Sequence, residues 1–255
     1  MNDAKAYLTP CLPYQRLSKN DGVPFDNPTL YRSIVGALQY LTFTRPDIAF
    51  VVHQVCQFMQ QPMLVHFLAV KRILRYIKGT ANYGLTYYRD SLDLKAFSDA
   101  NWARDPNDRR PTTGLVVFLG SNPISSSSKK QQIVSRSSTE AEYRALSSTT
   151  TKLDWLKQLM AFMQIPTSQT PVIFCDNIFV IALSFNSVKH QRTKHIEIDV
   201  HFVRERVASN QLCVQFVSSS EQFADILTKG PSAPLFHGHC NKLMLGPSQH
   251  ELERG

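Results

Sequence analysis

The chain has 255 residues, of which 43% are hydrophobic, and it carries a formal net charge of +8 with a pI near 9.3. This composition excludes wholesale disorder and allows one large domain or two small ones. The positive charge favours a polyanionic partner such as nucleic acid, although a basic enzyme without such a partner would have the same balance.

Residues 1–28 are expected to form an irregular leader, because prolines recur there and no hydrophobic period is present. Residues 29–82 are predicted to form a small helical segment, in which apolar side chains recur at helical spacing. Pro46 and Pro62 separate three helices, and Gly79 marks the end of the last one.

Residues 83–230 are expected to form a separate α/β domain. Its first half has strand patterns at 85–88, 94–99, 114–119 and 124–134, and tight turns link the last three into an antiparallel meander. Its second half alternates helices and strands, at 137–163, 172–175, 178–185, 196–207, 212–217 and from 221 onward. Because the later strands return through helices, they should run parallel to 94–99 in a mixed five-stranded sheet with flanking helices. Residues 231–255 remain as a C-terminal tail.

Four acidic residues, each in its own short motif, are the clearest functional signal. They are Asp99, Glu142, Asp176 and Asp225. Asp99 and Asp176 end neighbouring parallel strands, so both can reach the site that α/β sheets form outside the carboxyl ends of their strands. Carboxylates that converge there suit hard divalent cations. For any one acid taken alone, a turn or helix-capping role is the preferred alternative.

Two of these assignments have a rival. Glu140 lies three residues after Ser137, which is capping-box spacing, whereas Glu142 shares a helix face with residues suited to pack on the sheet. We therefore assign Glu142 to the site and Glu140 to the cap. Asp199 is the rival of Asp225 as the fourth acid, although a position at the solvent boundary suits Asp199 better.

Several motifs between residues 90 and 229 resemble the ribonuclease H domain of copia-type retrotransposon Pol polyproteins. The resemblance is carried, in unbroken order, by the segments 98–103, 108–114, 129–131, 134–143, 175–177, 192–196 and 224–229. Residues 31–41 and 71–80 are similar to the region that follows the reverse transcriptase palm in these polyproteins. The polymerase motif Tyr-x-Asp-Asp does not occur in this chain, so the resemblance does not imply reverse transcriptase activity.

The resemblance implies a ribonuclease H-like fold and an enzyme that cuts the RNA strand of an RNA–DNA hybrid with two Mg²⁺ ions, or with Mn²⁺. It makes the four acids both the catalytic residues and the metal ligands. The polymerase part of a reverse transcriptase is a further expected partner. The alternative is an inactive or co-opted fragment that binds nucleic acid without cutting it.

Basic residues supply candidate phosphate contacts. The candidates are Lys129, Lys130, Arg136, Arg192 and Lys194. For the last two, which lie near a basic helix, an ordinary solvated surface is an equally good interpretation.

The sequence also indicates a compartment. Five cysteines without a C-x-x-C pair are typical of a reducing environment. Residues 1–5 lack an apolar signal core, and no run approaches the ~20 apolar residues of a membrane span. We therefore expect a soluble intracellular protein, cytoplasmic in a retrotransposon particle or nuclear, that is not secreted and has no membrane partner.

Overall fold

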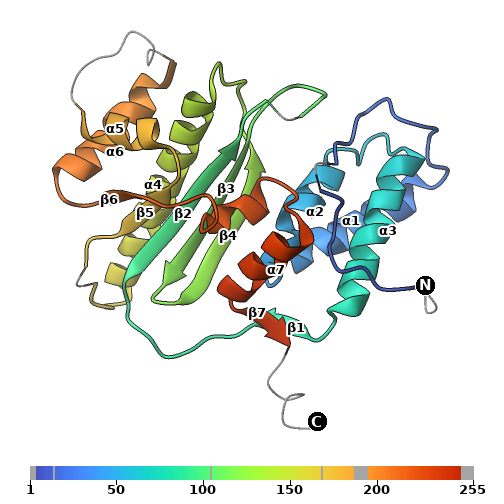
Figure 1. Ribbon diagram of the computed structural model, residues 1–255, viewed down its shortest axis with the longest axis horizontal. Coiled ribbons are helices and arrows are strands. Elements are labelled where there is room, and N and C mark those ends of the chain that lie inside the picture. The colour runs from blue at the N-terminus through green and yellow to red at the C-terminus, as the bar shows by residue number, and fades with distance from the viewer. Residues whose placement is uncertain (1–3, 14, 104, 168, 187–194, 248–255) are drawn as a thin grey trace. The chain divides into compact units, whose positions relative to one another are not determined.

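The computed structural model describes residues 4–13, 15–103, 105–167, 169–186 and 195–247. The chain divides into two compact units (Figure 1). The helical unit comprises residues 1–87, 104–109 and 229–255, and the sheet unit comprises residues 88–103 and 110–228.

The three helices expected after the leader are confirmed in the helical unit. The elements of this unit are α1 (Pro28–Leu41), η1 (Pro46–Ile48), α2 (Ala49–Cys56), α3 (Leu64–Gly79), β1 (Tyr83–Leu85), α7 (Ala233–Lys242) and β7 (Leu245–Pro247). Asn27 caps α1 by accepting a hydrogen bond from Leu30 N, and Pro28 opens the helix where its missing N–H costs nothing.

Two elements of the helical unit differ from the sequence prediction. The strand expected at 85–88 is β1, at Tyr83–Leu85, and it pairs with β7 in a two-stranded antiparallel sheet outside the main sheet. The tail contains α7, which the sequence pattern did not indicate. Only one face of α7 is buried, through Phe236, His239 and Cys240, and two of these three residues are polar or weakly apolar.

The expected mixed five-stranded sheet with flanking helices is confirmed in the sheet unit. Its strands are β2 (Leu94–Asn101), β3 (Thr112–Leu119), β4 (Asn122–Lys130), β5 (Val172–Cys175) and β6 (Cys213–Phe216). They lie in the order β4-β3-β2-β5-β6; β2, β3 and β4 are antiparallel, and β5 and β6 run parallel to β2.

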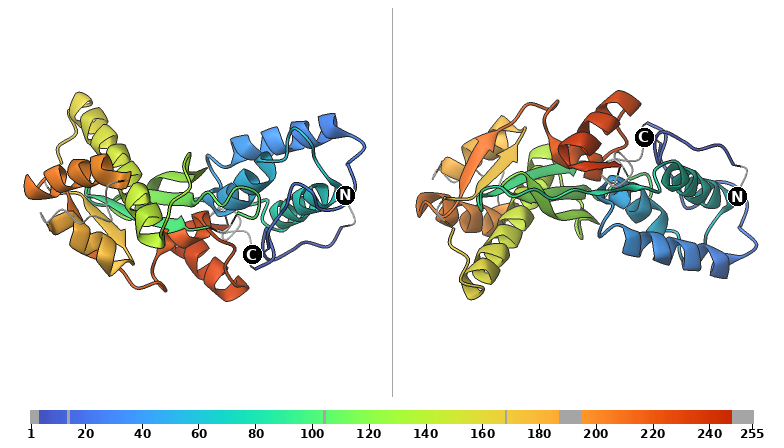
Figure 2. Two further views of the ribbon diagram at one scale, coloured as in Figure 1. Left: turned by 90° about the horizontal axis from the view of Figure 1, so that it is seen from above. Right: turned by 90° about the horizontal axis from the view of Figure 1, so that it is seen from below.

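The two faces of this sheet are covered differently. One face packs against α4 (Ser138–Phe162), α5 (Ile178–Phe185) and α6 (Glu197–Ala208) in a single apolar core. The right-hand view of Figure 2 shows α4, in yellow-green, on one side of the sheet. On the other face, Phe97 packs against Phe118, Phe174 and Phe223, the last of which opens η3 (Phe223–Leu227).

Two boundaries in the sheet unit correct the sequence prediction. β4 ends at Lys130 and not at 134, because the Gln131 side chain donates to Ala141 O (2.8 Å) and Thr113 Oγ1 (3.0 Å), and this turns the chain toward α4. The helix expected from 221 is only the short 3-10 turn η3. Pro231 follows closely, and a proline disfavours helical backbone at the residue before it.

Candidate functional site

The site lies where β2 extends past its parallel neighbour β5. The last register pair between the two strands joins Phe97 to Phe174. Asp99 lies two residues after Phe97, and Asp176 lies two residues after Phe174, so the two acids follow neighbouring strands at matching positions. Asp99 is buried, with 7% of its surface exposed, and Asp176 is half-buried. Ser219 Oγ, in the loop after β6, donates to Asp176 Oδ2 (3.2 Å).

The thiol of Cys175, at the end of β5, lies near three of the expected acids. Ligand atoms of Glu142, Cys175 and Asp176 all lie within 4.8 Å of one another. Burial is the main reason that the pKa of the Cys175 thiol is raised to about 12. The charges of Glu142, Asp176 and Asp99 add to this rise, and a hydrogen bond with the Asn177 backbone opposes it. Asp99, Glu142 and Asp176 are therefore electrostatic neighbours of one buried group.

Asp225 lies in η3, a turn linked to the same end of β2 through Thr228. It is buried, with 2% of its surface exposed, and its backbone carbonyl lies 3.3 Å from the hydroxyl of Thr228. That hydroxyl also donates a short hydrogen bond to Asp99 Oδ2. One threonine thus joins the strand that carries Asp99 to the turn that carries Asp225.

The donor set at this edge fits a hard divalent cation. The carboxylates of Asp99, Glu142 and Asp176 supply oxygen donors, which Mg²⁺ and Mn²⁺ prefer. The Cys175 thiol is protonated at neutral pH, and a thiol must lose its proton before it can bind a metal well. The chemistry of the set therefore favours an oxygen-ligated ion over zinc.

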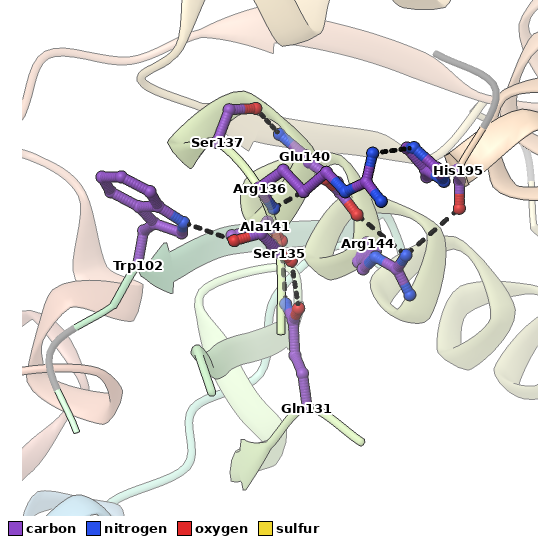
Figure 3. A network of polar contacts seen from close by, with 9 residues as sticks. All are labelled: Trp102, Gln131, Ser135, Arg136, Ser137, Glu140, Ala141, Arg144 and His195. Atoms are coloured by element: carbon purple, nitrogen blue, oxygen red, sulfur yellow. Dashed lines mark hydrogen bonds and ion pairs between the residues drawn. The ribbon is translucent and has the colours of Figure 1, made fainter. Parts of the chain in front are cut away.

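A polar network, shown in Figure 3, fixes the start of α4, the helix that carries Glu142. Ser137 Oγ accepts from Glu140 N (3.1 Å), so the expected capping contact is confirmed. The Glu140 carboxylate accepts from Arg136 N (2.8 Å), one residue before the cap, and from the Arg144 guanidinium (2.9 Å). Glu140 is therefore committed to the helix terminus and Glu142 is not part of this network.

The same network holds an exposed tryptophan. Trp102 Nε1 donates to Ser135 O (2.8 Å), and Ser135 Oγ donates to Gln131 Oε1 (3.2 Å). Trp102 keeps 44% of its surface exposed, and Ser135 is buried. At the other end of the network, Arg136 contacts His195 Nε2 (2.6 Å). An aromatic ring and a guanidinium are thus held at the terminus of the helix that carries Glu142.

The expected nucleic-acid contacts fall partly outside the described residues. Lys129 and Lys130, at the end of β4, line an open pocket of about 310 Å³ together with Arg144 of α4. Arg136 is exposed at the start of α4. Arg192 and Lys194 belong to the segment 187–194, which is not described.

Asp199, the rival fourth acid, lies in that basic pocket. Its carboxylate accepts from Ser147 Oγ (2.7 Å) across the contact between α6 and α4. Asp225, by contrast, is linked to Asp99 through Thr228.

Sequence reasoning missed three residues of this site. Cys175 and Thr228 lie inside the motifs that point to Asp176 and Asp225, and proximity in sequence is the signal that could have found them. Gln222 has no such signal, because it is buried by a long-range contact in which its Nε2 donates to Ser98 O (3.1 Å) on β2.

Within the described residues, no helix is both long enough and apolar enough to cross a membrane.

Comparison with known proteins identifies relatives along nearly the whole chain. It is 47% identical over 244 residues to the retrovirus-related Pol polyprotein from transposon RE1 of Arabidopsis thaliana, and the match covers 95% of this chain and 17% of the relative. It is 38% identical over 238 residues to the Pol polyprotein from transposon TNT 1-94 of Nicotiana tabacum, covering 90% of this chain and 18% of the relative. The chain thus spans about a sixth of the length of these curated relatives. No family model matches it.

Among solved structures, the N-terminal RNase H domain of a Mycobacterium tuberculosis protein, solved as a fusion with maltose-binding protein, matches with a TM-score of 0.39 at 18% identity. The match covers 59% of this chain and 98% of that one.

Proposed function

Because the chain belongs to the family of copia-type retrotransposon Pol polyproteins, we propose that its sheet unit is a ribonuclease that cuts the RNA strand of an RNA–DNA hybrid. The reaction is hydrolysis of a phosphodiester bond. Asp99, Glu142, Asp176 and Asp225 would hold two Mg²⁺ ions, with Mn²⁺ as a substitute. When bound, such a pair activates water and stabilises the departing 3′ oxygen.

The observation that carries this proposal is the gathering of acids around Cys175. Ligand atoms of Glu142 on α4, Cys175 and Asp176 lie within 4.8 Å of one another, and Asp99 lies at the position on the neighbouring strand β2 that matches Asp176. Carboxylates repel one another, so bringing three of them together is costly unless a cation or hydrogen bonds compensate the charge. A dinuclear metal site provides that compensation and also the chemistry.

The surface beside these acids suits a nucleic-acid substrate. Lys129 and Lys130 line the open pocket, and Arg136 lies at the start of α4, so each can neutralise a phosphate. Trp102 adds an exposed ring of the kind that packs against bases or sugars. Recognition of the hybrid would depend on its A-like shape and on ribose 2′-hydroxyls. We extend this role to Arg192 and Lys194 from the sequence alone.

One variant on β2 and two on α4 test the site assignment. Asp99→Asn and Glu142→Gln each remove a proposed metal ligand, and we expect both to abolish Mg²⁺-dependent cleavage of the RNA strand in a labelled hybrid. Glu140→Gln is the matched control. Glutamine also satisfies a capping box, so this variant should keep cleavage and lose about 1 kcal/mol of stability through its weaker contacts with Arg136 and Arg144.

Two results would contradict the site assignment in different ways. Cleavage by Asp99→Asn at the rate of the unmodified chain would exclude the proposed catalytic site. Loss of cleavage in Glu140→Gln without unfolding would transfer the role from Glu142 to Glu140.

A second candidate function is binding of nucleic acid without cleavage. It is favoured by the basic pocket, which is built from Lys129, Lys130 and Arg144 independently of the four acids. Binding of hybrid with no cleavage under either Mg²⁺ or Mn²⁺ would support it. Restoration of cleavage by adding the polymerase part of a reverse transcriptase in trans would show instead that this part is a required partner.

A further inference from the structure

The segment 222–228 is hydrogen-bonded to β2 at the point where that strand has lost its parallel neighbour. Gln222 Nε2 donates to Ser98 O (3.1 Å), Thr228 Oγ1 donates to Asp99 Oδ2, and Asn101 Nδ2 donates to Thr228 O (2.8 Å). Each of these contacts links residues more than 120 positions apart in the chain. Together they attach the turn that carries Asp225 to the strand that carries Asp99.

Both the nitrogen and the oxygen of the buried Gln222 side-chain amide form hydrogen bonds. Its side chain is fully buried, its Nε2 satisfies the β2 carbonyl, and its Oε1 accepts from Ala224 N (3.3 Å) at the start of η3. A buried carbonyl without a partner would cost about 1–3 kcal/mol, so this glutamine both completes the strand edge and sets the start of the turn.

The close packing depends on Gly114, the direct register partner of Asp99 on β3. A Cβ at this position would lie 2.5 Å from Thr228 Cγ2 and 2.8 Å from Ala224 O. Only glycine therefore lets η3 approach the strand closely enough for the Thr228 hydroxyl to reach the Asp99 carboxylate.

We propose that Gln222 and Thr228 are positioning residues that hold Asp99 and Asp225 in the arrangement needed to bind metal. Thr228 fixes one oxygen of the Asp99 carboxylate, and Gln222 fixes the turn that presents Asp225. Groups that orient metal ligands in this way commonly change metal affinity or activity by about 10–100-fold when they are removed. This inference rests on the proposed function, since it assigns the two acids to a metal site.

The first test removes only the hydroxyl of Thr228. In the full chain, Thr228→Val should raise the Mg²⁺ concentration for half-maximal cleavage about 10-fold or more, and Thr228→Ser, which keeps the hydroxyl, should restore it. Thr150→Val is the matched control, because Thr150 is also buried but its hydroxyl donates to Leu146 O within α4. Thermal unfolding of each variant confirms that it is folded.

A second measurement does not depend on cleavage. Calorimetric titration of Mn²⁺ into the full chain without nucleic acid should show about 10-fold weaker binding for Thr228→Val and for Gln222→Met, and unchanged binding for Thr150→Val. Mn²⁺ binding by Thr228→Val equal to that of the unmodified chain would overturn the inference. If the chain binds Mn²⁺ through Asp99 but cuts nothing, the proposed function fails while the positioning role is still measured.

Discussion

At the scale of single residues, two glutamates in one turn of α4 have separate roles because their directions differ. Glu140 is buried against the helix terminus, where it contacts Arg136 N and the Arg144 guanidinium. Glu142 points to Cys175 and Asp176 at the sheet. A helix advances 100° per residue, so positions two apart face nearly opposite ways. The local fold thus separates the acid that caps from the acid that faces the site.

The two tryptophans of the chain allow a prediction about the substrate surface. Trp102 lies beside the proposed site, and Trp155 is similarly exposed on α4, with Lys152 over its ring. In Trp155→Phe, where Trp102 is the only indole, hybrid added in Ca²⁺ should change the fluorescence. In Trp102→Phe, where only Trp155 remains, it should not, and hybrid affinity should fall about 5-fold or more. Equal signals from both variants would exclude Trp102 as a contact.

Some features of the site could be predicted from the sequence because they depend on local pattern. Asp99 and Asp176 each follow a short apolar run, and strand ends are local signals. The contact between Gln222 and Ser98 could not be predicted, because it depends on β2 extending beyond β5, which is a property of register. The same applies to Gly114, whose neighbours in η3 are more than 100 residues away in the chain.

At the scale of elements, hydrophobic period predicted the long helices and central strands well and the short polar elements poorly. α4 matches its expected range within one residue at each end, since capping and period agree there. α7 was missed because His239 and Cys240 occupy much of its buried face, and neither gives a strong apolar signal. Burial of polar groups is determined by tertiary contacts, which a local pattern does not record.

His239 makes the helical unit sensitive to acid. Burial, with smaller effects from Lys242 and Lys229, lowers the pKa of this histidine from 6.5 to about 4. The unfolded chain therefore takes up a proton at higher pH than the folded chain, and stability that is complete above pH 6.5 falls until about pH 4. The loss amounts to about 3 kcal/mol at most.

The measurement compares two histidines of the same helix. Urea unfolding between pH 7 and pH 4 should show a flatter pH dependence for His239→Gln than for the unmodified chain. His237→Gln should behave like the unmodified chain, because His237 is exposed. A slope that is unchanged in His239→Gln would assign the acid sensitivity to other groups.

At the scale of the whole molecule, the chain combines two units whose sequence order is interleaved. The described residues from 229 to 247 return to the helical unit after the sheet unit is complete, so β7 pairs with β1 across more than 150 residues. The family relationship also covers both units, since the match to the RE1 polyprotein spans 95% of the chain. The boundary that the sequence predicts between residues 230 and 231 would place β1 and its partner strand β7 in different segments.

The net charge of +8 raises the question of whether binding depends on total charge or on particular contacts. Each phosphate that a lysine neutralises releases counterions, so the slope of log affinity against log salt should decrease in magnitude by about 0.7–0.9 when one such contact is removed. Lys129→Ala and Lys130→Ala change residues of the open pocket, whereas Lys71→Ala removes the same charge from α3, where Lys71 lies over the Phe67 ring. We expect the smaller slope in hybrid-binding titrations only for the two pocket variants. Equal slopes for all three would mean that the hybrid responds to total charge and that the pocket is not its binding surface.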